Sequence, residues 1–227
     1  MRYDDIKTEL HALLMLTGGA LSLTFGDMLP LLIFGIIGFT LMWWRRDRIL
    51  SNTSTSFGVA NSITLGRLTL LILATLLYQE INPIIYGLAI LLVIIADGID
   101  GYYARKLNEE SAFGAAFDME TDAFMAALVT TVISIYLGVG VWLLVAGFLR
   151  YMFVLLVKIL GWHDLGTPHM PGAKLLAVLF FISLLLPFLL PLEYAKWGLM
   201  TGAMLVCFSF LREIVLLSLR RMSGSNK

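Results

Sequence analysis

The stretch ADGIDGYYARKLNEESAFGAAFDMETDAF, residues 96–124, determines how this chain folds and what it does. It carries four aspartates, Asp97, Asp100, Asp118 and Asp122, and apolar segments lie on both sides of it. A carboxylate at membrane depth is costly unless it is paired, solvated or bound to a metal ion. Four carboxylates at helical spacing in such a place therefore indicate a cation site that takes part in chemistry.

The composition is that of an integral membrane protein. Of 227 residues, 59% are hydrophobic and only 14% are charged, and the mean hydropathy is +0.88. A soluble domain is closer to a quarter charged. At roughly 20 residues per span, the chain holds about six to eight helices and no separate soluble domain. The formal net charge is zero, so we expect no nucleic-acid partner.

The apolar runs predict an all-α polytopic membrane protein with two N-terminal hydrophobic helices and a six-helix core. Residues 1–50 hold the N-terminal pair with its basic end, and residues 51–227 hold the six-transmembrane-helix catalytic core. The first two runs are short and meet at Gly26-Asp27, so they also fit a re-entrant pair. The expected helices lie at about 9–26, 28–44, 62–79, 82–98, 114–137, 140–160, 173–191 and 195–218.

The basic residues orient the chain, because cytoplasmic loops of membrane proteins are enriched in lysine and arginine. With eight spans, every basic cluster falls on one side, together with both termini and the aspartate stretch. We expect that side to be the cytoplasmic side of an inner or cytoplasmic membrane. The residues concerned are Arg45, Arg46, Arg48, Arg105, Lys106, Lys158, Lys174, Arg220, Arg221 and Lys227.

The spacing of the aspartates places them on two helix faces. Asp97 and Asp100 are three residues apart, and Gly114, Asp118 and Asp122 are spaced by four, so each set shares a face. The short linker between the sets predicts antiparallel neighbouring helices with these faces opposed. Carboxylates so close repel each other unless a cation lies among them. Ligands that are all oxygen suit Mg²⁺ or Mn²⁺.

The fixed positions of this stretch resemble the signature of the CDP-alcohol phosphotransferase family. Asn61-x-x-Thr64-x-x-Arg67 is also similar to the family's Pro-Asn-x-x-Thr-x-x-Arg opening, with Ala60 where a proline is common. The resemblance covers about residues 57–220 and leaves the N-terminal pair outside. The signature reads Asp97-x-x-Asp100-Gly101-x-x-Ala104-Arg105, eight residues, then Gly114-x-x-x-Asp118-x-x-x-Asp122.

The resemblance implies a metal-dependent enzyme of phospholipid biosynthesis. Its expected reaction transfers a phosphatidyl group from CDP-diacylglycerol to a small polar alcohol and releases CMP. Two Mg²⁺ or Mn²⁺ ions, a CDP-linked lipid, a small alcohol, the lipid bilayer and a second copy of the chain in a homodimer are the expected partners. The opposite direction, in which a CDP-alcohol donates its phosphoalcohol to a lipid acceptor, stays open.

The same resemblance assigns roles to residues of this chain. Asp97, Asp100 and Asp118 would ligate the metal ions. Asp122 would be the general base that takes the hydroxyl proton, and it would also reach a metal. The residues that would hold the CDP moiety are Asn61, Thr64, Gly101, Ala104, Arg105 and Gly114.

Basic residues inside or beside apolar runs are candidates for the acceptor pocket. Arg67, Arg150, Lys174 and Arg212 would favour an anionic alcohol such as glycerol phosphate or inositol phosphate. The alternative is structural, with Arg212 pairing with the adjacent Glu213 and the other side chains anchoring helices.

Other classes of function also use buried acids. An ion-pair network is one, although only Arg105 and Lys106 lie near the aspartates in sequence. An ion or proton transport pathway is another, but it leaves the small residues at fixed offsets unexplained. A structural membrane scaffold is a third.

Three further features carry weaker expectations. His163, Asp164 and His169 could form a second metal site, although a solvated loop fits them better. Glu109 and Glu110 read as a solvated loop. Gly198-x-x-x-Gly202 and Gly35-x-x-Gly38 permit close helix packing, in favour of the homodimer.

Overall fold

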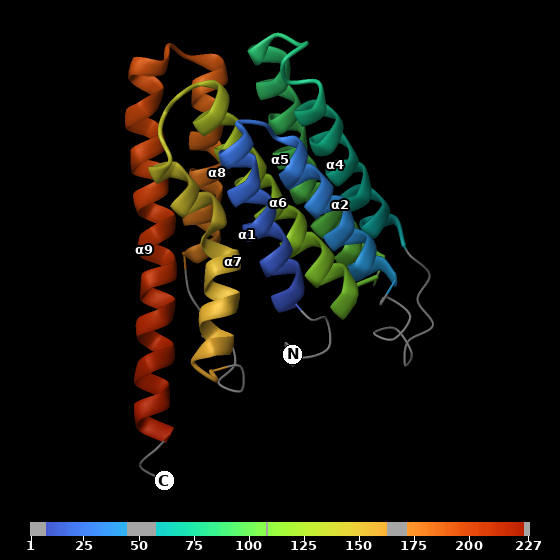
Figure 1. Cartoon of the computed structure of the whole chain (residues 1–227). Coiled ribbons are helices and arrows are strands. Elements are labelled where there is room, and N and C mark those ends of the chain that lie inside the picture. The colour runs from blue at the N-terminus through green and yellow to red at the C-terminus, as the bar shows by residue number, and fades with distance from the viewer. Residues whose placement is uncertain (1–7, 45–57, 108, 163–171, 225–227) are drawn as a thin grey trace.

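The computed structural model of the chain describes residues 8–44, 58–107, 109–162 and 172–224, and these form a bundle of eight helices. Successive helices run in opposite directions along the bundle (Figure 1). The described residues contain no strand, so the expected all-α fold is confirmed. The helices are α1 (Thr8–Phe25), α2 (Leu29–Trp44), α4 (Val59–Leu76), α5 (Pro83–Lys106), α6 (Ala112–Tyr136), α7 (Trp142–Ile159), α8 (Ala173–Leu189) and α9 (Leu192–Gly224).

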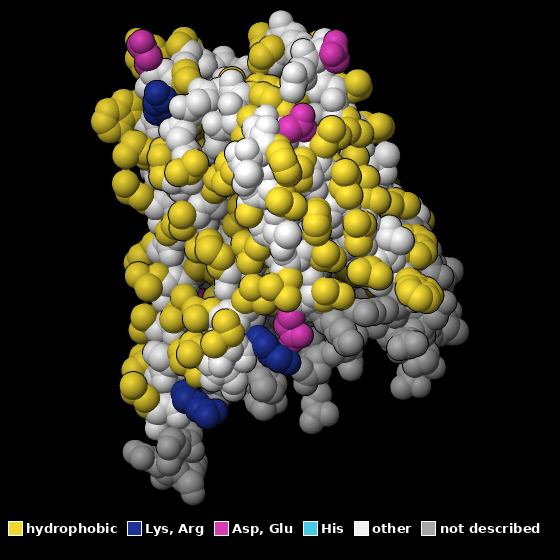
Figure 2. Space-filling view, in the orientation of Figure 1, with side chains coloured by type: hydrophobic (Ala, Val, Ile, Leu, Met, Phe, Trp, Pro, Cys, Tyr) yellow, Lys and Arg dark blue, Asp and Glu magenta, His cyan; other side chains and the backbone are white. Residues whose placement is uncertain are grey.

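The described helices have the length and composition of a membrane protein. Five of them, α4, α5, α6, α7 and α9, are long and apolar enough to cross a bilayer, and α2 and α8 are apolar but shorter. Hydrophobic side chains cover most of the face drawn in Figure 2, and its acidic and basic side chains lie near the two ends. The chain is therefore an integral membrane protein.

Two helices extend further than their apolar runs predict. The fourth run ends at residue 98, but α5 continues to Lys106. The last helix, α9, spans Leu192–Gly224 and so exceeds the expected 195–218 at both ends. Apolar runs end where charged residues begin, whereas lysine and arginine are good helix formers, so the backbone continues as a helix beyond the apolar run. The first half of the aspartate motif consequently lies entirely on a helix.

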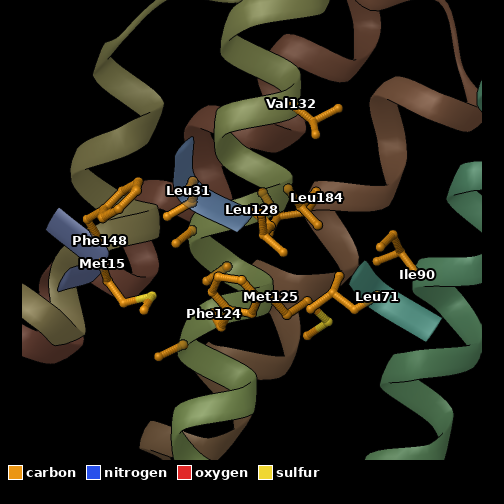
Figure 3. Packing of buried hydrophobic residues seen from close by; sticks show 14 of the residues in the cluster. Met15, Leu31, Leu71, Ile90, Phe124, Met125, Leu128, Val132, Phe148 and Leu184 are labelled. Atoms are coloured by element: carbon orange, nitrogen blue, oxygen red, sulfur yellow. The ribbon is translucent and has the colours of Figure 1, made fainter. Parts of the chain in front are cut away.

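Helix α6 forms the centre of the bundle. In the 18-residue apolar segment of α6, 72% of the residues are buried inside the protein, compared with 22% in the corresponding segment of α9. Phe124, Met125 and Leu128 of α6 lie among side chains from surrounding helices (Figure 3). The labelled neighbours come from α1, α2, α4, α5, α7 and α8: Met15, Leu31, Leu71, Ile90, Phe148 and Leu184. The second half of the aspartate motif, from Gly114 to Asp122, therefore lies on the helix at the centre of the bundle.

Polar side chains cap the N-termini of the two helices that carry the aspartates. Asn82 accepts a hydrogen bond from the backbone N–H of Ile84 at 2.8 Å, and Pro83 occupies the first turn of α5. Ser111 accepts one from the N–H of Gly114 at 3.0 Å at the start of α6. Such caps satisfy donors that have no partner within the helix.

The aspartate faces of α5 and α6 are opposed as expected, since one oxygen each of Asp97, Asp100 and Asp118 lies within 4.8 Å of the others, but the two helix backbones are not closely packed. Among the described residues, α5 packs mainly on α4 and α8, whereas α6 packs on α7 and α4. Helix α4 thus contacts both aspartate-bearing helices, which scarcely touch each other. The physical reason is charge: two rows of carboxylates cannot be opposed without a cation, and α4 supplies one, as described below.

The glycines expected to support a dimer pack against helices of the same chain. A Cβ at Gly198 would collide with Leu186, and one at Gly202 with Ser183, so these glycines bring α9 close to α8. A Cβ at Gly35 would collide with Phe124 of α6, and one at Gly38 with His11 of α1. These glycines therefore give no support to a homodimer.

The N-terminal pair packs onto the core. Helix α1 contacts α7 and α6, and α2 contacts α6. Gly19 makes room for the ring of Phe148 on α7, and Glu9 pairs with Lys158 of α7 at 2.9 Å. The ring of Phe124 fits against Gly35 as described above. Helices α1 and α2 thus share their packing surface with the helix that carries Asp118 and Asp122.

Replacing Gly35 with leucine tests this packing. The Gly35→Leu side chain would drive into the ring of Phe124, and overpacking of this kind costs about 1–3 kcal/mol. We expect a lower midpoint of thermal unfolding in detergent. Ile36→Leu is the matched control, because Ile36 is 47% exposed on the outer face of the same helix. Equal midpoints for the two variants would contradict the packing.

Candidate functional site

One arginine binds all four aspartates of the motif. The guanidinium of Arg67, on α4, donates from Nη1 to Asp100 Oδ2 and to Asp118 Oδ1, both at 2.7 Å. Its Nη2 donates to Asp122 Oδ1 at 2.6 Å and lies 3.1 Å from Asp97 Oδ1. The planar fork of arginine is suited to several carboxylates at once. The structure therefore gathers the four carboxylates from α5 and α6 around one cation from α4.

Burial differs sharply across this cluster. The side chains of Arg67 and Asp100 are only 1% and 5% exposed. Those of Asp97, Asp118 and Asp122 are 32%, 40% and 30% exposed. Arg67 and Asp100 consequently form the buried side of the cluster, and Asp97, Asp118 and Asp122 form its partly exposed side.

The carboxylates fit a divalent cation. One oxygen from each of Asp97, Asp100 and Asp118 lies within 4.8 Å of the others. Hard oxygen ligands of this kind suit Mg²⁺ or Mn²⁺. Arg67 supplies one positive charge for four carboxyl groups, so an ion-pair network with Arg67 alone does not account for the cluster. Asp97, Asp100 and Asp118 could hold the metal, and Asp122 lies outside this group of three.

A cleft of about 370 Å³ adjoins the carboxylates. All six residues that the motif associates with the CDP moiety lie in its lining, together with Asp100 and Asp118. Gly114 belongs there for a steric reason, because a Cβ at this position would lie 2.7 Å from Asn61 Oδ1. The lining comprises Ala60, Asn61, Thr64, Asp100, Gly101, Ala104, Arg105, Glu109, Glu110, Ser111, Gly114, Ala115 and Asp118.

Glu109 has a structural role that the sequence did not reveal. Its Oε2 accepts a hydrogen bond from the backbone N–H of Ala60 at 3.1 Å, in the first turn of α4. A carboxylate at a helix N-terminus satisfies free donors and the positive end of the helix dipole. Gly58, with φ +70°, allows this approach, because a Cβ there would lie 2.7 Å from Glu109. The expectation that Glu109 belongs to a solvated loop is therefore wrong.

None of the residues proposed for an acceptor pocket lines the cleft. These residues are Arg67, Arg150, Lys174 and Arg212. Arg67 lies beneath the aspartates. Arg150, on α7, donates from Nη2 to Glu120 Oε1 at 2.6 Å, and Lys174 is exposed in the first turn of α8.

Glu120 and His11 form a second buried polar contact, which sequence reasoning missed. Glu120 is 2% exposed and His11 is 7% exposed, and their Oε2 and Nε2 atoms lie 3.5 Å apart. Glu120 therefore links α6 to α1 and, through Arg150, to α7. A signal existed: Glu120 and Arg150 are opposite charges within apolar helices. The loop residues His163, Asp164 and His169 lie outside the described residues.

A family model for CDP-alcohol phosphatidyltransferase matches residues 57–215. An uncharacterized protein of Aquifex aeolicus (strain VF5) is 40% identical over 76 residues, which cover 34% of this chain and 39% of that protein. The chain thus aligns with well under half of this curated relative. No solved structure matches the chain.

A bulky residue at Gly101 is expected to block the cleft without unfolding the protein. The nearest atom to a Cβ at Gly101 is Arg105 Nη1 at 3.6 Å, so Gly101→Leu fits but enters the cleft. We expect at least a tenfold loss of affinity for CDP, measured by titration calorimetry in detergent with Mg²⁺.

Gly98→Leu is the matched control for this experiment. Gly98 lies one turn earlier on α5, outside the cleft lining, with open space around its Cβ position. It should change neither the CDP affinity nor the unfolding midpoint. An unchanged affinity in the folded Gly101→Leu variant would show that CDP does not enter this cleft.

Proposed function

The chain belongs to the CDP-alcohol phosphatidyltransferase family, and we propose that it makes a phospholipid by transferring a phosphatidyl group from CDP-diacylglycerol to a small polar alcohol. The family performs phospholipid synthesis from CDP-linked substrates in the membrane. The donor, the acceptor and the residue roles that follow are part of the proposal.

The observation that carries the proposal is the coincidence of the cleft and the carboxylate cluster. Asp100 and Asp118 belong to both. A CDP-linked lipid bound in the cleft would present its diphosphate to the carboxylate side of the site. Arg105, in the cleft lining, is a suitable partner for a phosphate oxygen.

The proposed step is a displacement at phosphorus. The hydroxyl oxygen of the acceptor attacks the phosphorus that carries the diacylglycerol, and a new P–O bond forms. The P–O bond to CMP breaks, and CMP leaves with the electron pair. The hydroxyl proton passes to the carboxylate of Asp122, which acts as general base.

The division of roles follows the geometry of the aspartates. Asp97, Asp100 and Asp118 would hold the divalent metal, and Asp122 lies outside this group but shares Arg67 with it. A bound Mg²⁺ or Mn²⁺ would neutralise charge that develops on the diphosphate oxygens. Asp122, with its side chain 30% exposed, could still reach the acceptor hydroxyl. A second metal ion and a homodimer are proposed on the family resemblance alone.

The proposed site faces the cytoplasm. The start of α1, the connection between α5 and α6 and the end of α9 all lie at one end of the bundle (Figure 1). Arg105 and Lys106 close α5, and Arg220 and Arg221 lie in the last turns of α9, at this same end. Lysine and arginine are enriched on the cytoplasmic side of membrane proteins.

The acceptor alcohol is best assigned by assay. We expect purified protein to release CMP from CDP-diacylglycerol in the presence of Mg²⁺ or Mn²⁺ with one acceptor from a panel. The panel contains glycerol 3-phosphate, inositol, inositol phosphate, serine, choline and phosphatidylglycerol. A chelator should abolish the release, because the carboxylates would then lack the metal that binds the diphosphate.

Asp122→Asn tests the base assignment in the same assay. We expect a fall in kcat of about 10²–10⁴-fold, the usual contribution of a general base. Mn²⁺ binding should persist, because Asp97, Asp100 and Asp118 are unchanged. Full turnover in this variant would refute the role of Asp122.

If no acceptor in the panel gives CMP release, two further assays distinguish the alternative functions. CMP release from a CDP-alcohol with a diacylglycerol acceptor would reverse the direction of transfer. Cation flux in liposomes without any CMP release would favour a transporter.

A further inference from the structure

We infer that Arg67 is a positioning residue that assembles the metal ligands from beneath, holding one oxygen of each carboxylate and leaving the other oxygen for the metal. This inference rests on the proposed function, since it concerns the metal that the family uses. Under this inference Arg67 supports the metal ligands from their buried side and does not contact the acceptor alcohol.

Arg67 contacts one named oxygen of each of the four carboxylates. Arg67 contacts Oδ1 of Asp97, Asp118 and Asp122 and Oδ2 of Asp100. Asp100 Oδ2 also accepts a hydrogen bond from Thr64 Oγ1 at 2.9 Å, so this oxygen already has two donors. Each of these contacts involves one oxygen, and each carboxylate has a second oxygen that could ligate another cation.

Burial shows which side that cation would approach from. Arg67 is 1% exposed and lies on the closed side of the cluster. Asp97, Asp118 and Asp122 keep about a third of their side-chain surface exposed, and Asp118 also lines the cleft. A metal that arrives through the cleft therefore meets the carboxylates opposite Arg67 and has no need to displace it.

Charge and topology explain why the ligands need such a residue. The ligands come from α5 and α6, which scarcely touch each other, and α4 contacts both. Without a cation between the helices, the four carboxylates would repel one another. Arg67 links the two helices through α4 and reduces the cost of bringing the ligands together before the metal binds. Hydrogen bonds to metal-ligating groups commonly raise metal affinity 10–100-fold.

The alternative is that Arg67 competes with the metal. A guanidinium that occupied the metal position would have to move away when the metal binds. Positioning and competition predict opposite signs for the same substitution. Removing Arg67 weakens metal binding if it positions the ligands, and strengthens metal binding if it competes.

The test is a titration of Mn²⁺ into purified protein, followed by electron paramagnetic resonance. We expect Arg67→Gln to weaken Mn²⁺ binding about 10–100-fold. Arg67→Lys, which keeps the charge but lacks the fork, should fall between Arg67→Gln and the wild type. The unfolding midpoint in the absence of metal should fall in the same order.

Arg150→Gln is the matched control. Arg150 is also an arginine within the bundle that binds an acidic residue of α6, but its partner Glu120 lies outside the metal-binding trio. This variant should be less stable than the wild type and should keep the wild-type Mn²⁺ affinity.

Equal or tighter Mn²⁺ binding by folded Arg67→Gln would overturn the inference. If Arg67→Gln does not fold, wild-type affinity in Arg67→Lys would overturn it instead. Neither result depends on turnover. Failure of the proposed function would be seen separately, as absence of CMP release by the wild-type protein.

Discussion

The fold depends on one electrostatic constraint, the placement of four carboxylates between helices that have membrane composition. Arg67 meets this constraint with a single guanidinium that contacts Asp97, Asp100, Asp118 and Asp122. Removing one partner of a buried ion pair typically costs about 3–5 kcal/mol, so this contact has a strong influence on how the helices assemble. It explains why α4 lies between α5 and α6.

The surrounding bundle holds α6 in one orientation around this contact. Asp118 and Asp122 point toward Arg67, whereas Glu120, two residues from each, is buried against Arg150 and His11. Residues two apart on a helix face nearly opposite directions, so the two contacts together resist rotation of α6 about its axis. Gly35 adds a steric contact with Phe124 on the same helix. The N-terminal pair, outside the residues matched by the family model, is thus part of the framework that positions the site.

The sequence predicted local features well and long-range contacts poorly. Eight helices and the two aspartate faces follow from apolar runs and from spacings of three and four, which are properties of the helix itself. The contact of Arg67 with Asp122 spans 55 residues, and no local pattern shows where an arginine on another helix will point. The glycines illustrate the same limit: Gly198 and Gly202 indicate close packing, but only the structure shows that the partner is α8 rather than a second chain. Likewise, the polar stretch around Glu109 predicts a solvated loop, and only the structure shows that Glu109 accepts a hydrogen bond from the backbone N–H of Ala60.

The proposed metal site has Arg67 beneath it and opens to the cleft on its other side. An experimental structure of the wild-type protein with Mn²⁺, with the metal located by anomalous scattering, tests this most directly. We expect a manganese peak bound by Asp97, Asp100 and Asp118 on the cleft side, with Arg67 still in contact with the carboxylates. A peak at the position of the Arg67 guanidinium, with the side chain displaced, would contradict it, as would the absence of manganese from the three aspartates.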